Sequence, residues 1–501
     1  MNKVTIVGSG VAGLATATRL IAKGYDVSIF ESAAYTGGKI HSFNLDGYRF
    51  DAGPSLFTLP HLVDDLFKNL GENPRDFFNY EKKDIHCEYF WNDGKKLTAY
   101  SDISKYFTQI YEQFGVHESI MHRYLKRSKR KYELTQNIFL QKSLHKFSTY
   151  LSIDILKAIP FLRSLDIFKS LNQANKLFLK EPHLVQLYNR YATYNGSNPY
   201  ETPGIMSLIQ HLESHYGTWV PKKGMVEISK SLTRLLKKKG AKIYLNSNVD
   251  EIITKGNKAI GVLSNGKEFE SDYVVSNMDI FFTYKKLLKN IEMPKRVNRS
   301  ERSSSAVIFY WGINRVFDQL DLHNILFSEN YHNEFETIFK KRELTNDPTI
   351  YINITSKDIP ADAPKGCENW FVMINAPYDC KQNWETMIKK LRKNVINKIN
   401  KMLKVDIEKS IQVEKIYTPK TIETMTQSHL GSLYGTSSNS KLSAFLRHPN
   451  FTNKINNLFF TGGSVHPGGG IPLCLMSANI VANEFKDRSV SYTHLTLPTK
   501  A

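Results

Sequence analysis

One short segment near the start of the chain constrains its fold more than any other. Val4–Val7 is an apolar run of strand length, and Gly8, Gly10 and Gly13 follow it in a G-x-G-x-x-G pattern. The Ala- and Leu-rich stretch 11–23 then predicts a helix. This order of strand, glycine loop and helix predicts a Rossmann-like α/β unit that binds a dinucleotide.

The three glycines of this loop have different expected roles. Gly8 permits a tight turn, Gly10 lets the backbone approach a pyrophosphate, and Gly13 lets the helix pack closely on the sheet. The helix that begins at Val11 and Ala12 offers free N–H groups and a positive dipole to the phosphates. We therefore expect all five residues to take part in the binding site.

A second predicted strand, 27–30, ends at a carboxylate, Glu31. An acid eighteen residues past Gly13 can accept both ribose hydroxyls of an adenosine, and it disfavours the 2′-phosphate of NADP. Two adjacent glycines follow shortly and permit a second close approach of the backbone, although a plain surface turn would look the same. The predicted contacts in this stretch are Glu31, Ser32, Gly37, Gly38 and Lys39.

A second glycine-rich loop lies near the other end of the chain. Residues 457–461 predict a strand, 473–485 predict a helix, and five glycines fall between 462 and 470. Such a loop suits the approach of backbone to a flat cofactor, and the following helix N-terminus would favour negative charge there. A flexible loop is the alternative. The predicted contacts are Gly462, Gly463, Gly470, Ile471 and Pro472.

Together these segments resemble the large FAD superfamily that includes amine oxidases and carotenoid desaturases. Residues 462–473, GGSVHPGGGIPL, are similar to the C-terminal motif of bacterial carotenoid desaturases. The similarity extends to 48–55, 223–225 and 272–277, and it covers the chain to about Phe485. It implies FAD as the cofactor, with no metal. It also implies cofactor contacts from Pro54, Ser55 and the backbone of Val249.

Within that family, three segments look most similar to flavobacterial 1-hydroxycarotenoid 3,4-desaturases: 53–67, 204–208 and 435–439. This resemblance implies a carotenoid substrate and desaturation at the acyclic end of a monocyclic, γ-type molecule. Phytoene-type desaturases and terminal-methyl oxygenases belong to the same family and are the alternatives. A flavin amine oxidase and a non-catalytic carotenoid-binding flavoprotein are less favoured.

The sequence offers no compelling catalytic dyad. Desaturation removes a hydride and a proton, and a polyene stabilises positive charge beside it, so little acid–base help is required. His466 is a weak catalytic candidate, because a loop histidine is more often a structural hydrogen-bonding group. Arg49 and Asp51 are expected to order the loop near the flavin. A polar residue near the closed end of an apolar tunnel should bind the substrate hydroxyl, but the sequence does not identify it.

The motifs also predict how the chain is divided. The expected units are a discontinuous FAD-binding domain (1–75, 215–290 and 455–486) and a discontinuous α+β substrate domain (80–214 and 291–454). The substrate domain should contain strands at 87–91 and 306–312 and a helix near 384–403. A β-rich stretch from Ala241 should include a hairpin turn at Asn265-Gly266. Residues 489–501 have no periodicity and are expected to form a tail.

The charge of the chain is unusual. Lys and Arg number 67 against 48 Asp and Glu, which gives a net charge of +19. Thirteen basic and three acidic residues fall in 121–180, interleaved with apolar side chains and densest at 126–131. This predicts a helical region that lies on an anionic membrane surface. The alternative is a core helix with a basic outer face. No recognised nucleic-acid module is present, so nucleic acid is not an expected partner.

The spacing of the cysteines indicates the cellular compartment of the protein. Cys87, Cys367, Cys380 and Cys474 are widely scattered and show no C-x-x-C spacing, which favours reduced thiols and no structural zinc. No run of 18 apolar residues is present to predict a transmembrane helix. We therefore expect a cytoplasmic protein that is peripherally associated with the inner face of the cell membrane. The oligomeric state is not predicted.

Overall fold

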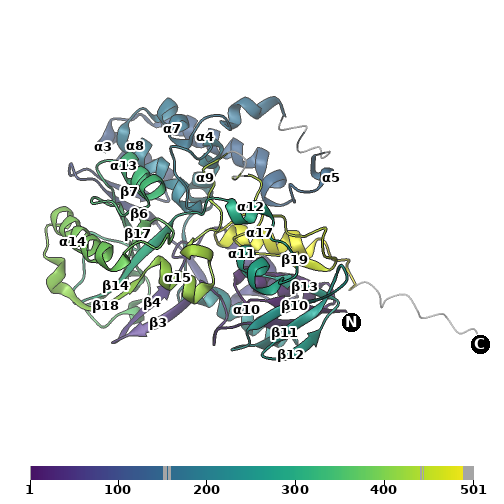
Figure 1. Cartoon of the computed structure of the whole chain (residues 1–501). Helices are drawn as coiled ribbons and strands as arrows, with labels where there is room; N and C mark the ends of the chain where they lie inside the picture. Colours follow the sequence, from purple (N-terminus) through teal and green to yellow (C-terminus); the bar gives the residue numbers. More distant parts are fainter. Residues whose placement is uncertain (1, 151–154, 156–158, 441–442, 444, 489–501) are drawn as a thin grey trace, which may run out of the picture.

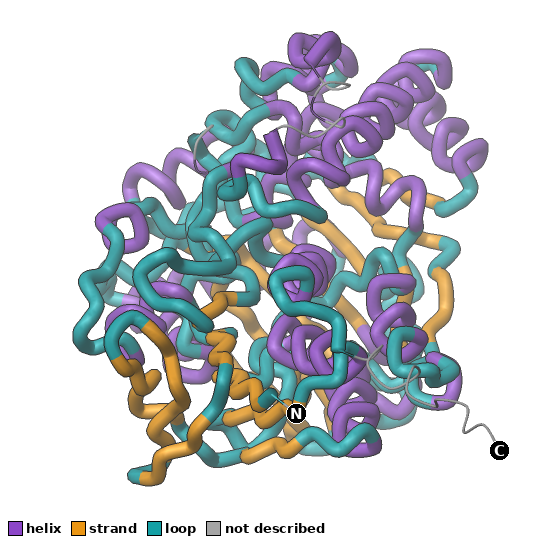
Figure 2. The backbone as a smooth tube through the Cα atoms, turned by 90° about the vertical axis from the view of Figure 1, so that its right-hand side faces the viewer, coloured by secondary structure: helices purple, strands orange, loops and turns teal. Residues whose placement is uncertain are grey.

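Two β-sheets organise the molecule. The computed structural model describes residues 2–150, 155, 159–440, 443 and 445–488. The predicted tail at 489–501 and part of the basic stretch 121–180 lie outside the described residues. A parallel sheet lies near the N-terminus, a larger mixed sheet lies beside it, and helices gather at the end away from the N-terminus (Figures 1 and 2).

The first sheet is parallel throughout, which fits its short and nearly continuous apolar strands. Its order is β19 (Leu458–Phe460), β13 (Tyr273–Ser276), β1 (Lys3–Val7), β2 (Asp26–Phe30) and β9 (Lys242–Tyr244). These strands come from all three segments that the sequence assigns to the FAD-binding domain. The exact domain boundaries stay a prediction.

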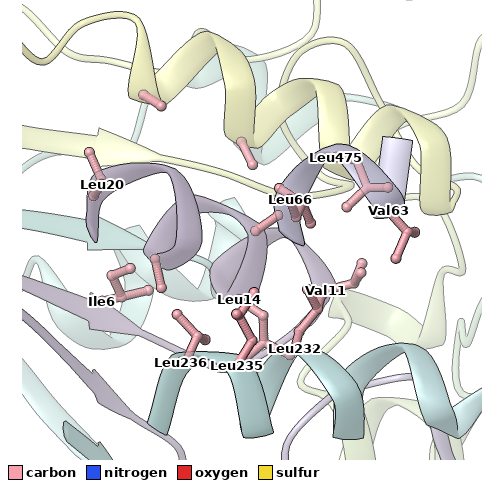
Figure 3. Close-up of a cluster of buried hydrophobic side chains, with 14 of the residues drawn as sticks. Ile6, Val11, Leu14, Leu20, Val63, Leu66, Leu232, Leu235, Leu236 and Leu475 are labelled. Atoms are coloured by element: carbon pink, nitrogen blue, oxygen red, sulfur yellow. The ribbon is translucent and has the colours of Figure 1, made fainter. Parts of the chain in front are cut away.

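Helix α1 (Val11–Ala22) carries the core of this region. It lies between α10 (Val226–Lys238) and α17 (Ile471–Ala482), with α2 (His61–Lys68) beside it (Figure 3). Helix α17 begins two residues before the predicted 473, because proline fits the first turn of a helix, where its missing N–H costs nothing.

A small antiparallel sheet extends this region. It consists of β10 (Val249–Lys255), β11 (Lys258–Ser264) and β12 (Lys267–Glu270). The turn between β11 and β12 is the predicted Asn265-Gly266 hairpin. Val249, at the start of β10, lies close to the end of β2, because the nearby Ser247 N–H donates to the carbonyl of Glu31 at 2.8 Å.

The second sheet is mixed and has seven strands. In order they are β18 (Ile411–Tyr417), β14 (Ser305–Ile313), β17 (Glu368–Ala376), β16 (Ile350–Ile354), β15 (His323–Leu326), β6 (Ile85–Phe90) and β7 (Lys96–Tyr100). Helix α14 (Trp384–Leu403), at the predicted position, packs against one face. The hairpin β3 (His41–Leu45) and β4 (Tyr48–Ala52) packs against β14 and β17. A two-stranded ribbon joins β5 (Tyr80–Lys82) to β8 (Trp219–Pro221).

Helices cover the other end of the large sheet. They include α3 (Ile103–Phe114), α4 (Glu118–Thr135), α7 (Leu171–Leu179), α8 (Pro182–Asn189), α9 (Leu208–Tyr216) and α13 (Tyr331–Glu336). Shorter helices include α5 (Phe147–Tyr150), α11 (Ile280–Phe282), α12 (Lys295–Arg299) and α15 (Pro419–Thr426). Among the described residues, no helix has both the length and the apolar character needed to cross a bilayer.

Helix α4 lies at the most basic part of the sequence and has two distinct faces. Met121, Tyr124 and Ser128 are buried, whereas Lys126, Lys129 and Arg130 are exposed. Lys131 lies on the buried face, so it cannot contact a membrane, although it is part of the predicted basic run. Its ammonium group pairs with Asp166 at 2.8 Å and donates to the carbonyl of Gly204 at 3.0 Å. This helix therefore packs in the core and has a basic outer face.

Candidate cofactor and substrate site

The carboxyl ends of the parallel strands form a crevice. The Gly8 N–H donates to the carbonyl of Phe30 at 2.8 Å, which joins the ends of β1 and β2. The Gly37 N–H donates to the carbonyl of Ser9 at 2.9 Å, which holds the second glycine pair against the first loop. Gly10 is the N-cap residue of α1. The first N–H groups of a helix have no partner within it, so the N-terminus of α1 offers them to the crevice.

Glu31 lies at the centre of a dense set of hydrogen bonds. One carboxylate oxygen accepts from the Ser9 N–H at 2.8 Å and from the Ser9 hydroxyl at 2.7 Å. The other accepts from the Ala33 N–H at 2.9 Å and from the Ser32 hydroxyl at 3.3 Å. The side chain is therefore held rigidly at the end of β2, where the sequence predicts an adenosine ribose.

The glycines of the crevice are required by contacts within the chain as well as by any ligand. A Cβ atom at Gly13 would lie 2.3 Å from the carbonyl oxygen of Gly8, so α1 could not approach the loop as it does. A Cβ at Gly10 would lie 2.7 Å from Oδ1 of Asn277. A Cβ at Gly38 would lie 3.2 Å from the Cα of Gly10. The close approach predicted from the motif is thus present between these segments themselves.

Asn277 joins the three loops of the crevice, and sequence reasoning did not identify it as a site residue. Its N–H donates to the carbonyl of Val7 at 2.7 Å, and its Nδ2 donates to the carbonyl of Thr461 at 2.9 Å. A Cβ at Gly462 would lie 2.6 Å from the same Nδ2. A polar residue directly after β13 was a usable signal, because the carboxyl ends of neighbouring parallel strands meet at one edge.

The C-terminal glycine loop forms another wall. Gly470 is the N-cap of α17 with a φ of +101°, and its Cβ position faces open space within 4 Å. Gly463 packs against Gly469, and a Cβ atom at Gly463 would lie 3.1 Å from the Cα of Gly469. The loop therefore presents bare backbone and a helix N-terminus to a cavity, which is the surface that a flat, electron-rich ring system requires.

His466 is held within this loop by backbone groups. Its N–H donates to the carbonyl of His448, and its Nε2 lies 2.9 Å from the carbonyl of Lys142. A carbonyl can only accept, so Nε2 carries the proton. Burial lowers the pKa of His466 to about 4, so the ring is neutral near pH 7. This geometry favours a structural role, and the weak catalytic candidacy of His466 stays a prediction.

Arg49 and Asp51, which the sequence expects to order the loop near the flavin, form an ion pair at β4. The guanidinium of Arg49 lies 2.6 Å from Asp51 and 2.8 Å from Asp362. Asp51 also accepts from the N–H groups of Met225 and Val226, at the start of α10. The pair therefore joins β4 to α10.

Two further reactive groups face the cavity. Lys39 donates to the carbonyl of Leu433 at 2.7 Å, and burial lowers the pKa of its ammonium group, although Asp279 and Cys474 oppose the shift. Burial raises the pKa of the Cys474 thiol to about 11, so this cysteine is a neutral thiol near pH 7. A thiol with a raised pKa is not an activated nucleophile.

A single cavity of about 560 Å³ connects the crevice to the large sheet. Its wall contains His466 and every predicted cofactor contact except Gly13, which lies behind the loop where α1 packs: Gly8, Gly10, Val11, Ala12, Glu31, Ser32, Gly37, Gly38, Lys39, Pro54, Ser55, Val249, Gly462, Gly463, Gly470, Ile471 and Pro472. The predicted residues, which span most of the chain, therefore meet at one place. This open crevice of bare backbone and helix N-termini fits a dinucleotide with a flat ring system.

The part of the cavity beside the large sheet is mostly apolar. Its wall includes Phe139, Leu140, Ile205, Ile209, Leu212, Ile325, Phe371 and Met373. A buried ion pair interrupts it: Arg190 lies 3.6 Å from Glu213, which also accepts from the hydroxyls of Tyr191 and Tyr194. Burial opposes ionisation of Glu213, but Arg190, His86 and the two tyrosine hydroxyls together outweigh it and lower the pKa of the carboxyl group. Sequence reasoning identified none of these side chains, because they come from segments far apart.

Comparison with known families identifies this architecture. Residues 11–485 match the family described as flavin-containing amine oxidoreductase. The chain belongs to the flavin-containing amine oxidoreductase family. It is an FAD-dependent oxidoreductase, and this membership confirms the cofactor and the enzyme class that the sequence predicts.

Two curated relatives are similar over almost their full length. The chain is 54% identical to the 1-hydroxycarotenoid 3,4-desaturase of Flavobacterium sp. (strain P99-3), covering 96% of this chain and 99% of the relative. It is 32% identical to the 4,4′-diapolycopene oxygenase of Methylomonas sp., covering 96% and 98%. The predicted resemblance to carotenoid desaturases is therefore confirmed.

Among solved structures, the cyclohexylamine oxidase of Brevibacterium oxydans shares the fold. Its TM-score is 0.61 at 13% identity, and the alignment covers 96% of this chain and 98% of that structure. At this identity the likeness concerns the fold alone.

Proposed function

We propose that this protein is an FAD-dependent carotenoid desaturase that introduces the C3–C4 double bond at the acyclic end of a 1-hydroxy, γ-type carotenoid. The observation that carries the proposal is the 54% identity, over nearly the whole of both chains, to a 1-hydroxycarotenoid 3,4-desaturase. The cavity supports it, because the mostly apolar wall beside the large sheet suits a hydrocarbon chain.

The crevice residues would hold the cofactor in a fixed order. The N–H groups beyond Gly10 would bind the pyrophosphate, Glu31 the ribose, and the backbone of Val249 the adenine. The loop at Pro54 and Ser55 and the start of α17 would enclose the ring system. FAD, when bound, supplies the acceptor for the hydride that leaves the substrate.

The protein's own contribution to the reaction is mainly binding and orientation. The apolar wall would hold the polyene beside the start of α17 and exclude water from it. The ring of His466 is neutral, with its Nε2 proton donated to the carbonyl of Lys142, and its lowered pKa of about 4 makes Nδ1 a weak base for the substrate's proton. The polyene itself spreads the positive charge that develops as the hydride departs.

Product analysis tests the desaturase assignment. The purified protein, incubated with a 1-hydroxy γ-type carotenoid, should yield a product with one more conjugated double bond and absorption at longer wavelength. Without oxygen or another acceptor, the same substrate should bleach the flavin absorbance. A carotenoid that binds without bleaching would identify a binding protein, and efficient conversion of phytoene would identify a phytoene-type desaturase.

A terminal-methyl oxygenase is the second candidate. It rests on the 32% identity to a 4,4′-diapolycopene oxygenase. Incubation under ¹⁸O₂ separates the two, because an oxygenase product carries the label and a desaturase product does not. Label at a terminal methyl carbon would replace the 3,4-desaturase assignment by the oxygenase.

We further propose that the outer face of the helical region rests on an anionic membrane on the cytoplasmic side. The exposed bases Lys126, Lys129 and Arg130 lie on α4, and Phe168 and Leu177 are 78% and 55% exposed nearby in the chain. Basic groups beside exposed apolar groups are the combination that binds the interface of such a bilayer. A lipid-dissolved substrate would then have a short path to the protein.

A further inference from the structure

We propose that His323, held in place by Tyr351 and Asn353, donates the hydrogen bond that selects the hydroxyl group of the substrate. The inference rests on the proposed function, and it names the polar group that the sequence could not identify. His323 begins β15 in the middle of the large sheet, and its side chain lines the cavity. It belongs to neither the glycine motifs nor the ion pair of Arg190 and Glu213.

Two side chains fix the imidazole on one side. The Nδ1 atom of His323 lies 2.7 Å from the hydroxyl of Tyr351 and 3.3 Å from the Nδ2 of Asn353. The same Asn353 Nδ2 donates to the carbonyl of Leu322 at 2.9 Å. Because a carbonyl can only accept, this bond sets the orientation of the amide and directs its second N–H at His323.

That orientation determines the tautomer. An amide N–H can only donate, so Nδ1 of His323 must be the acceptor, and the proton of the neutral ring lies on Nε2. Burial lowers the pKa of His323 to about 3, so the ring stays neutral at physiological pH. The charged and titratable groups around it are Glu213, Lys83, Arg190 and His86.

The Nε2–H has no hydrogen-bond partner among the described residues. The residue is only 3% exposed and lines the cavity, so bulk water does not satisfy this donor. Leaving a buried donor unpaired is costly, and native proteins rarely do so without a reason. The wall of this cavity is mostly apolar apart from groups such as Arg190 and Glu213, and an acceptor on the ligand would satisfy the donor of His323. A hydroxyl oxygen is the acceptor that a 1-hydroxycarotenoid offers.

The position of His323 also agrees with the proposed reaction. The hydroxyl of Tyr351 lies 2.8 Å from the hydroxyl of Ser55. Ser55 belongs to the loop that would enclose the flavin ring. The hydrogen bonds from Ser55 to Tyr351 and from Tyr351 to His323 therefore connect His323 to the proposed reaction site. The substrate hydroxyl is on C1, only two bonds from C3, so the group that binds it must lie close to the reacting bond.

Two substitutions at His323 test the pairing. His323→Leu removes the donor and keeps an apolar side chain, whereas His323→Gln restores an N–H close to the position of Nε2–H. We expect His323→Leu to lower kcat/KM for the hydroxylated carotenoid about 10- to 100-fold and to change the non-hydroxylated one by less than about threefold. His323→Gln should recover part of the loss. His211→Leu is the matched control, because His211 is also buried but is not part of the cavity wall.

Carotenoid binding provides a second readout that does not require turnover. The affinities of both carotenoids are measured in detergent micelles by the shift of their absorption. The pairing predicts that wild type and His211→Leu prefer the hydroxylated carotenoid and that His323→Leu does not, with unchanged flavin content in all three. An unchanged preference in His323→Leu, or no preference in wild type, would overturn it. If the wild type prefers to bind the hydroxylated carotenoid but does not convert it, the hydrogen bond from His323 is retained and the desaturase function is rejected.

Discussion

The crevice and the substrate side of the cavity are built in different ways. In the crevice, backbone atoms meet directly: the position of a Gly13 Cβ is 2.3 Å from the carbonyl oxygen of Gly8. On the substrate side, side chains from distant segments converge, as Arg190 and Tyr89 or His323 and Tyr351 do. Close contact between backbone atoms requires glycine, so it produces a motif that can be recognised in the sequence. Contacts between side chains of distant segments can be made by many residue types, so they produce no such motif.

The largest expected effect comes from adding atoms where backbone meets backbone. Gly13→Val would place a branched side chain against the carbonyl oxygen of Gly8, and the helix could not reach its position on the sheet. We expect no folded flavoprotein to accumulate. Gly71→Ala is the control, because nothing lies within 4 Å of its Cβ position and only its left-handed φ of +71° opposes the change, at a cost of about 1–2 kcal/mol. Flavin content and the soluble yield check both variants, and a yellow, stable Gly13→Val protein would contradict the comparison.

Removing one buried charge where side chains from distant segments meet should destabilise the fold, but by less than the glycine substitution. Asp166 accepts from Arg127 at 2.6 Å and from Lys131 at 2.8 Å, and Lys131 is only 3% exposed. Asp166→Asn keeps the shape and leaves that lysine without its anion, so the free energy of unfolding should fall by about 3 kcal/mol. Adding Lys131→Met should restore part of it. Thermal unfolding of the three variants measures this, and equal midpoints would show that the pair is not structural.

A smaller effect on stability is expected at Gly10, where the contact with Asn277 and the proposed contact with the pyrophosphate are two separate reasons for a glycine. Gly10→Ala would bring a methyl group within 2.7 Å of Asn277 Oδ1, a flexible side-chain atom, at a cost of about 1–2 kcal/mol. Asn277→Ala removes that clash but also the hydrogen bond to Thr461, so Asn277→Ala alone is the reference. If the pyrophosphate also needs the bare backbone, adding Gly10→Ala to this reference should leave its stability nearly unchanged and lower its FAD affinity. Unchanged FAD affinity would mean that the glycine serves only the contact within the chain.

The smallest effect on stability is expected at the outer face of α4. Reversing Lys126, Lys129 and Arg130 to Glu should change the free energy of unfolding by less than about 0.5 kcal/mol, because these side chains are exposed. The same change should weaken binding to anionic liposomes, by about 1 kcal/mol for each basic group near the surface, and added salt should weaken wild-type binding. Equal binding of wild type to neutral and anionic liposomes would reject the electrostatic attraction.

Local patterns predicted much of the fold. The strand, loop and helix at 4–23, the hairpin turn at Asn265-Gly266 and the helix at 384–403 all occur where periodicity and turn chemistry place them. Dinucleotide binding followed from the order of the motifs, whereas FAD and the enzyme class followed from the family resemblance. These features depend on residues close together in the sequence, so a short window contains the whole signal.

The rest depends on three-dimensional convergence. Counting charges in 121–180 did not separate Lys131 from its neighbours, although helical spacing from Tyr124 and Ser128 places it on their buried face. Asn277 and His323 act through partners far away in the sequence, Thr461 and Tyr351 among them. Identifying such partners requires the register of both sheets, which composition and local pattern do not give.

The parallel sheet also sets an order of events during synthesis. Its central strand, β1, is made first, but its edge strand β19 and the covering helix α17 are the last described elements. The hydroxyls of Thr16 and Thr461 that meet at this junction are 445 residues apart. A growing chain on the ribosome therefore lacks this edge strand and its covering helix until the far segment emerges. We expect cofactor loading to be a late step, so a chain interrupted before β19 should leave the ribosome without FAD.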